Sequence, residues 1–360
     1  MLKKAYSIII ICSLAMVSGC QNEKDFVEPI SFEKVYNITD DLEEVIITTD
    51  LFSTTGMSAG DDFLFLLSNE KDTVVRVFNH SDMAYLGGFG TEGDGPREFF
   101  HPYQDGFRIF QGNVLSMMDR RSIRKLTPSK EETQLDRGIS LNTIERHKIP
   151  GLMIPHWEGS FLGDSSIIGL NQTLNDYQLI NYNYKSDTIS YLFDYPPIKF
   201  TGNQIEKPIT FYSKIKFSKD NKKLVMVYQK MPLLRIIDLE SGNETYTKIG
   251  DTFVSDYLVD SKGYPVEDNT YFYFRVSVSN DYIFASYRKR QNKYFDDKPS
   301  ETLYLSKNEI HVFDLEGNPK VKFIIDDWMT MFTALPDSKY LIFRHPEKER
   351  SLFRYKIPVL

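Results

Sequence analysis

The chain has 360 residues and a formal net charge of −7, because 50 Asp and Glu outnumber 43 Lys and Arg. This acidic balance argues against a nucleic-acid-binding protein, which would need clustered Lys and Arg. Both cysteines, Cys12 and Cys20, lie near the N-terminus, so the rest of the chain has no disulfide and no thiolate metal site. Stability must come from packing, and 22 Tyr and 26 Phe together with many Val, Ile and Thr favour β-structure.

The N-terminus has the features of an export signal. Lys3 and Lys4 precede an apolar stretch of 13 residues, Ala5–Val17, and the sequence Val-Ser-Gly-Cys then ends at Cys20. Because about 20 apolar residues are needed to span a bilayer, this stretch is too short for a transmembrane helix and is typical of a signal peptide. An ordinary secretory signal with an incidental cysteine is the alternative interpretation.

The small residues directly before Cys20 resemble the processing site of bacterial lipoproteins. The resemblance implies cleavage before Cys20 and acyl chains, such as palmitate, on its sulfur and its new amino group, which would anchor the protein to a membrane. We assign residues 1–19 to a signal peptide, 20–40 to a lipidated tether and 41–360 to the folded domain. The acidic segment Gln21–Phe26 is similar to the tag that sends lipoproteins of some Gram-negative bacteria to the outer face of the outer membrane.

A repeated pattern fills the rest of the chain. Six units, each a polar turn followed by an apolar strand, begin near residues 59, 110, 163, 218, 279 and 336, about 51 to 61 residues apart. Alternating β-hairpins follow from Val74, Leu179, Leu233 and Glu309, with a poorer copy from Ser122. Propeller blades repeat every 40 to about 50 residues, and longer loops extend that spacing. Because no helical period is convincing, the sequence predicts an all-β, six-bladed β-propeller of four-stranded antiparallel blades.

The two ends of the chain predict how the ring of blades closes. The last unit, Trp328–Leu360, holds about three strands, whereas the early strand Leu42–Leu51 has no hairpin partner of its own. Pairing of this N-terminal strand with the last blade would complete four strands and remove an exposed sheet edge.

The segment Leu86–Phe100, LGGFGTEGDGPREFF, contains the G-x-G-x-x-G pattern of a dinucleotide-binding turn. Such a turn needs a following helix whose N-terminus holds the pyrophosphate. Here a Gly-Pro pair follows, and Glu92 and Asp94 would place negative charge where a phosphate should lie. We therefore interpret the segment as a structural connection between blades, with phenylalanines as packing anchors. The residues assigned to this turn are Gly88, Gly90, Gly93, Gly95 and Pro96.

The same segment resembles the G-x-F-G-x-x-G-x-G-P-x-E-F signature of the NHL-like and TolB-like six-bladed propeller lipoproteins common in gut Bacteroidetes. The matching positions are Gly88, Phe89, Gly90, Gly93, Gly95, Pro96, Glu98 and Phe99. Arg97 stands where those proteins often carry glycine. The resemblance implies the fold and a lipid anchor, and it adds little about activity, because a fold alone does not define a reaction.

Other polar groups give weak candidates for a site, and we expect no metal and no cofactor. The histidines form no close ligand pair and are most simply solvated or capping groups; they are His80, His101, His147, His156, His311 and His345. The acidic pairs would suit Ca²⁺ or acid–base chemistry, but neighbours on a strand point to opposite faces, so surface turns are expected. These pairs are Asp61-Asp62, Asp296-Asp297 and Asp326-Asp327.

Three further segments are candidates for a binding surface. Arg288–Asn308 interrupts the fifth unit with a long loop of basic, acidic and aromatic residues. Asn181–Asp187 and Asn269–Phe274 alternate aromatic residues that would either stack on sugars or pack between blades.

We expect a lipid-anchored envelope protein that binds a glycan, a peptide or a partner protein at the loop face of the propeller, without catalysis. The competing hypothesis is a hydrolase or lyase acting on a polysaccharide or peptide, which predicts ionisable groups converging at the channel mouth. A third hypothesis, a structural subunit of an envelope complex, predicts a large apolar surface patch.

Overall fold

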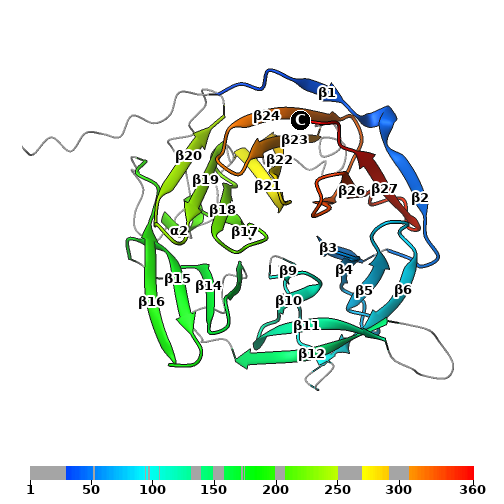
Figure 1. Cartoon of the computed structure of the whole chain (residues 1–360), viewed down its shortest axis with the longest axis horizontal. Coiled ribbons are helices and arrows are strands. Elements are labelled where there is room, and N and C mark those ends of the chain that lie inside the picture. Colours follow the sequence, from blue (N-terminus) through cyan, green and yellow to red (C-terminus); the bar gives the residue numbers. More distant parts are fainter. Residues whose placement is uncertain are drawn as a thin grey trace, which may run out of the picture.

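A computed structural model describes residues 30–51, 53–93, 95, 98–104, 106–130, 139–148, 158–171, 173, 175–198, 207–249, 270–291 and 308–360. Within these residues, six β-sheets are arranged in a ring like the blades of a propeller (Figure 1). This arrangement confirms the all-β, six-bladed fold predicted from the sequence. The described helices are the 3-10 helix Thr39–Asp41 and α2 (Lys207–Thr210), and neither is long and apolar enough to cross a membrane.

The first four blades have four antiparallel strands each, in chain order from the centre of the ring outwards (Figure 1). Blade 1 contains β3 (Thr54–Ala59), β4 (Phe63–Ser68), β5 (Val75–Asn79) and β6 (Tyr85–Phe89). Blade 2 contains β9 (Arg108–Gln111), β10 (Val114–Met118), β11 (Ser122–Lys130) and β12 (Ile139–Lys148). Blade 3 contains β13 (Gly159–Leu162), β14 (Ser166–Leu170), β15 (Tyr177–Asn183) and β16 (Thr188–Asp194). Blade 4 contains β17 (Ser213–Phe217), β18 (Lys223–Tyr228), β19 (Leu233–Asp238) and β20 (Glu244–Lys248).

The N-terminal segment completes the last two blades. Blade 5 contains β21 (Thr270–Val278), β22 (Tyr282–Gln291), β23 (Asn308–Asp314) and β24 (Pro319–Ile325), to which β1 (Val35–Asn37) adds a parallel fifth strand. Blade 6 contains β25 (Met331–Ala334), β26 (Tyr340–Arg344), β27 (Ser351–Lys356) and, antiparallel to β27, β2 (Glu43–Ile46). The predicted closure of the ring by an N-terminal strand is therefore confirmed.

Part of the segment that the sequence assigns to a tether, residues 30–40, lies against the propeller instead. The backbone N–H of Ile30 donates to the carbonyl of Lys248 on blade 4 at 3.1 Å. The ring of Phe32 packs on Phe313 of blade 5, and β1 then pairs with β24. The sequence shows no apolar alternation at β1, because the three residues of this strand are all exposed.

The apolar core consists of separate clusters between the blades. Among the described residues, the buried apolar side chains form six clusters, one at each blade interface. Central strands are buried on both faces, as in β18, whose residues Leu224–Tyr228 are all buried. Outer strands such as β16 are largely exposed. Each blade therefore depends on both neighbours for burial of its two faces.

A disulfide across the closing strands should stabilise the fold. Glu43 pairs with Arg354 in the β2–β27 ladder, and their side chains form an ion pair at 2.7 Å, so both point to the same side. In the chain from residue 21 on, which has no cysteine, Glu43→Cys with Arg354→Cys should form a disulfide and raise the free energy of unfolding by about 2–4 kcal/mol. Chemical denaturation of the oxidised and the reduced variant measures the gain.

The neighbouring pair, Glu44→Cys with Arg354→Cys, provides the control for register. Glu44 is paired with Phe353, and adjacent side chains point to opposite faces, so this pair should remain reduced. Disulfide formation in the control but not in the first variant would contradict the register of ring closure.

Candidate functional site

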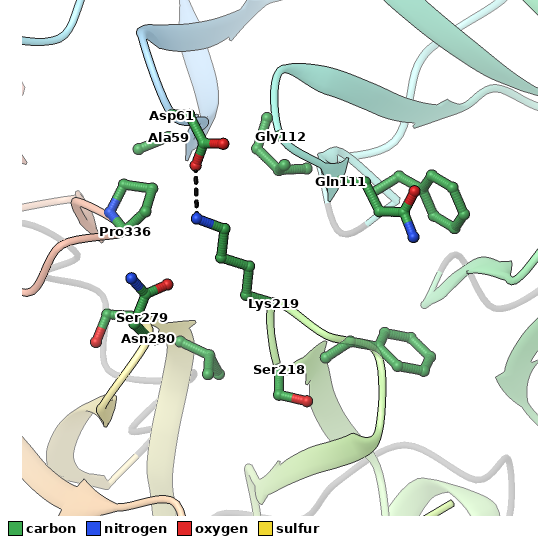
Figure 2. Close-up of a pocket in the computed structure, with 13 residues that line it drawn as sticks. Ala59, Asp61, Gln111, Gly112, Ser218, Lys219, Ser279, Asn280 and Pro336 are labelled. Carbon is green, nitrogen blue, oxygen red and sulfur yellow. Dashed lines mark ion pairs between the residues drawn. The ribbon is translucent and has the colours of Figure 1, made fainter.

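The inner strands surround a central channel, and hydrogen bonds and an ion pair connect the turns at one end of it. At this end, the turns that follow the inner strands form hydrogen bonds with one another. The backbone N–H of Asp61 donates to the carbonyl of Gly112 at 3.2 Å, and the backbone N–H of Asn280 donates to the carbonyl of Pro336 at 2.9 Å. Lys219 of blade 4 reaches across to Asp61 of blade 1, with 2.8 Å between Nζ and Oδ1 (Figure 2). The cavity at this end, called the closed face below, has a volume of about 60 Å³, which suits a few water molecules.

The opposite end of the channel opens into a chamber of about 340 Å³, called the open chamber below. This volume lies at the lower end of the range of small-molecule pockets. Its lining combines aromatic, cationic and amide side chains, and they are Phe274, Trp328, Lys214, Arg275, Gln104, Gln229 and Asn308. Such a mixture can stack on a ring, bond to hydroxyl groups and attract negative charge.

A smaller cavity of about 40 Å³, called the inner cavity below, continues from the open chamber towards the closed face and shares Lys214 and Arg275 with it. Lys216 and Glu158 also line this cavity. Glu158 is 4% exposed and forms an ion pair with Lys214, with 2.8 Å between Nζ and Oε1. Lys216 donates from Nζ to the carbonyl of Phe107 on blade 2 at 3.3 Å.

The alternation of β17 explains how these lysines reach the channel. Lys214 and Lys216 are separated by Ile215, which is 1% exposed and belongs to the core between blades 3 and 4. Because successive side chains on a strand point to opposite faces, the two lysines share the other face. The pattern Lys-Ile-Lys-Phe in an innermost strand is the sequence signal that could have identified them.

Arg108, on the inner strand β9, is a buried cation between the inner cavity and the closed face. Arg108 is 2% exposed, and none of its three side-chain nitrogens makes a hydrogen bond within the described part of the chain. Its guanidinium carbon lies 4.6 Å from the ring centroid of Phe217 on β17, two blades away. Burial lowers the pKa of Arg108 to about 9, while the charge of Glu158 opposes that change. Arg108 is therefore still protonated at pH 7.

Among the described residues, cationic side chains outnumber carboxylates around the open chamber and the inner cavity. The described lining holds three cations, Lys214, Lys216 and Arg275, and one carboxylate, Glu158. Arg108 is a further buried cation near Glu158, whose charge acts on its pKa.

The glycine segment forms the connection from blade 1 to blade 2, and the described residues that follow it form no helix. Its strands β7 (Thr91–Glu92) and β8 (Glu98–Phe99) pair in parallel, and Gly90 has a φ of +80°, which glycine adopts readily. The N–H of Gly95 donates to the Glu98 carboxylate at 2.7 Å. Gly88 lies in β6, and a side chain there would meet Thr73 at 2.6 Å. Cys20 and Pro96 lie outside the described residues.

The rings of this segment lie between the first two blades. Phe89 and Phe99 meet edge to face with their centroids 5.9 Å apart, and both belong to the core cluster between those blades. Arg124 covers Phe99, with its guanidinium carbon 4.4 Å from the ring centroid. These contacts explain the aromatic positions of the motif by packing.

The described histidines do not line the open chamber or the inner cavity. Four of them lie beside carboxylates: His101 with Glu92 at 3.1 Å, His147 with Glu145 at 2.6 Å, His311 with Glu309 at 2.9 Å and His345 with Asp327 at 3.2 Å. His80 lies at the turn after β5, and His156 is outside the described residues. In the part of the chain that the structure describes, no group of three or more His, Cys, Asp or Glu is placed to hold a metal ion.

The two described acidic pairs, Asp61-Asp62 and Asp326-Asp327, lie in turns and connections. Asp62 accepts a hydrogen bond from Asn113 at 2.7 Å, and Asp326 accepts one from Asn37 at 2.6 Å. Asp296-Asp297 and most of the loop Arg288–Asn308 lie outside the described residues.

The aromatic segments divide between packing and the channel. Tyr182 and Tyr184 pack between blades 2 and 3, and the ring of Tyr184 stacks on His147 at 3.7 Å. Tyr273 is fully buried between blades 4 and 5, whereas its neighbour Phe274 lines the open chamber. Packing therefore explains most of these rings, and Phe274 is the exception.

Comparison with known proteins supports this architecture. The family described as TolB-like 6-blade propeller-like matches residues 40–335. A member of the DUF4221 family from Bacteroides vulgatus ATCC 8482 has a similar fold, with a TM-score of 0.58 and 9% identity over 88% of this chain and 98% of that chain. A protein of Bacteroides fragilis NCTC 9343, described as exported, gives a TM-score of 0.55 and 12% identity over 91% and 99% of the two chains. No curated protein matches the sequence.

Replacement of Gly93 by alanine should destabilise the fold more than the same change at another glycine of positive φ. A Cβ at Gly93 would lie 2.2 Å from the Glu98 carboxylate, which accepts the hydrogen bond of Gly95. We expect Gly93→Ala to cost about 2–3 kcal/mol of unfolding free energy in urea denaturation.

Gly163→Ala is the matched control for this change. Gly163 also has positive φ, +62°, but a Cβ there would meet nothing within 4 Å, so it should cost about 1 kcal/mol. Equal losses of unfolding free energy in the Gly93 and Gly163 variants would show that close packing does not explain the glycine at position 93.

Proposed function

The chain belongs to the TolB-like six-bladed propeller family, and we propose that it is a non-enzymatic binding module that receives part of a glycan, a peptide or a partner protein in the open chamber. The main support for this proposal is the difference between the two ends of the channel. Hydrogen bonds between turns and an ion pair cross one end, where the cavity is about 60 Å³, and the other end widens to about 340 Å³. Ligands of propellers enter at such channel mouths, because the surrounding connections vary freely while the blades stay rigid.

The composition of the lining supports binding without catalysis. Hydrolysis of glycosidic bonds usually needs two carboxyl groups that flank the scissile bond. Among the described lining residues of the open chamber and the inner cavity, Glu158 is the one carboxylate, and Lys214 neutralises it. No described histidine lines either cavity. Among the described residues, these two cavities do not bring together the ionisable groups that the competing hypothesis of a hydrolase or lyase predicts.

We also propose that the protein acts outside the cytoplasm, anchored in the outer membrane through lipid on Cys20. The support is the signal sequence that ends at this cysteine, together with the exported description of a protein of similar fold. Ile30, ten residues after Cys20, forms a β-bridge with Ile249 of the propeller. Ten residues span at most about 35 Å, so the anchor would keep blades 4 and 5 near the membrane surface.

Ligand binding should depend on Trp328 in the open chamber. We would record thermal unfolding of the chain from residue 21 on with panels of oligosaccharides and peptides, since a ligand at 100 times its Kd adds about 2.7 kcal/mol of stability. Trp328→Ala should reduce the affinity of the ligand found by tenfold or more, because it removes a stacking surface.

Tyr191→Ala provides the control, because Tyr191 is an exposed aromatic residue on the outer strand β16. It should leave the affinity unchanged. A ligand whose binding is lost in the Tyr191 variant but retained in the Trp328 variant would refute the open chamber as the binding site.

Replacement of Cys20 by serine should release the protein from the membrane fraction. The change removes the sulfur that would carry lipid, and the loss of acyl chains removes the hydrophobic anchor. Metabolic labelling with palmitate, followed by fractionation, measures both effects. Unchanged labelling of the Cys20→Ser protein would contradict the anchor.

A further inference from the structure

We infer that the open chamber binds the terminal unit of a saccharide chain, through the face of the sugar ring and through its hydroxyl groups. The inference rests on the proposed binding function, and it specifies the class of ligand and the way in which the ligand enters.

The first argument is a set of polar side chains in the lining that the fold does not use. Gln104 belongs to the connection into blade 2, Gln229 to the turn after β18 of blade 4, and Ser286 to β22 of blade 5. Within the described structure, the side chains of these three residues form no hydrogen bond. Each amide has donors and an acceptor, and a hydroxyl group can act as either, so the set matches the hydroxyl groups of a sugar.

An amide that supports the fold looks different. Gln178, between blades 3 and 4, is 2% exposed, and its Oε1 accepts hydrogen bonds from Tyr228 at 2.8 Å and from Arg235 at 2.7 Å. By contrast, Gln104 is exposed and Gln229 is half-buried. The two amides of the chamber can therefore bond to a ligand without breaking a hydrogen bond of the described fold.

The second argument is the fixed position of Trp328, in the connection from β24 to β25. Its backbone N–H donates to the Asp327 carboxylate at 2.7 Å, and Asn308 of blade 5 donates from Nδ2 to the Asp327 carbonyl at 2.7 Å. His345 of blade 6 lies 3.2 Å from the same carboxylate through its Nε2. Two blades thus hold the connection that places the indole ring in the lining. A sugar ring that stacks on a ring held in place loses less affinity to the ordering of the site.

The third argument is that the channel narrows beyond the chamber. On β21, Phe274 lines the open chamber and the inner cavity, Val276 lines the inner cavity, and Val278 lines the cavity at the closed face. The three cavities therefore follow one another along this strand, with volumes of about 340, 40 and 60 Å³. The chamber has room for a sugar unit, whereas the smaller cavities suit a few water molecules. A saccharide chain can thus place its end in the chamber but cannot thread through the channel.

The lining also favours a sugar over a peptide. Phe274 and Trp328 offer aromatic faces of the kind on which sugar rings stack. Besides these rings, the described lining has one apolar side chain, Met329, which is 8% exposed. An aliphatic peptide side chain would therefore find little apolar surface to contact. A sugar presents hydroxyl groups around the edge of its ring, and these can bond to the amides of Gln104 and Gln229.

Calorimetric titration with neutral sugars and neutral peptides tests the class of ligand. The sugars are cellotriose, maltotriose, mannotriose and galactotriose, and the peptides are triserine and trialanine with both termini blocked. We expect at least one sugar to bind at least tenfold more tightly than either peptide. The absence of binding by all four sugars at millimolar concentration would overturn the inference.

Two blocked forms of the trisaccharide that binds test entry by its end. One form carries 2-aminobenzamide at the reducing end, and the other carries a benzylidene acetal on the sugar at the opposite end. Because the chamber receives one end, one block should weaken binding at least tenfold and the other should leave it unchanged. The form that loses affinity identifies the end that enters. Unchanged affinity of both forms would overturn entry by the end.

Two glutamines provide matched variants. Gln229→Leu keeps the size of the side chain but removes its amide from the chamber, so it should weaken sugar binding by about tenfold. The thermal midpoint of the unliganded variant should not fall, because this amide forms no hydrogen bond within the described structure. Gln111→Leu makes the same change at the closed face and should leave the affinity unchanged. Unchanged affinity in both Gln229→Leu and Gln104→Leu would overturn recognition through the amides.

The outcomes separate this inference from the proposed function. Tighter binding of a peptide than of any sugar, with loss of that binding in Trp328→Ala, would overturn the saccharide class and leave the binding function intact. Sugar binding that is unchanged in Trp328→Ala would place the site outside the open chamber, and would overturn the proposed function itself.

Discussion

The structure depends on closure of the ring, because every blade must bury both of its faces. The six apolar clusters lie between blades, so each one exists only while two neighbouring blades stay in contact. The cluster between blades 6 and 1 joins the two ends of the folded domain, and β2 brings the N-terminal segment to that junction by pairing with β27. Loss of this pairing would expose a sheet edge and weaken the junction at the same time.

Closure of the ring also determines where the chemistry lies. The inner strands surround the channel, and the short turns that follow them are close enough to bond across one end. The other end receives the connections between blades, and there the channel stays wide. The cationic side chains of β17 and β21 reach this wider part because their neighbours on the same strands face the apolar clusters. Packing between the blades therefore directs these charged side chains towards the channel.

The fold could be predicted from the sequence, because blade repeats and hairpin turns are local patterns that recur along the chain. Ring closure was predictable for the same reason, since Leu42–Leu51 had no hairpin partner. The site was not predictable in this way. Lys216 meets the carbonyl of Phe107, and Arg108 meets the ring of Phe217, only after blades 2 and 4 take their places in the ring, and no spacing in the chain records these contacts. The short strand β1 was missed because its pairing uses the backbone and leaves its side chains exposed.

The central claim is that the open chamber at one end of a closed ring is the binding site. A crystal structure of the protein grown with the oligosaccharide or peptide that raises its thermal midpoint tests this claim most directly. We expect the ligand to lie in the open chamber in contact with Trp328. A ligand bound at the closed face, or on the outer strands of a blade with the channel empty, would contradict it.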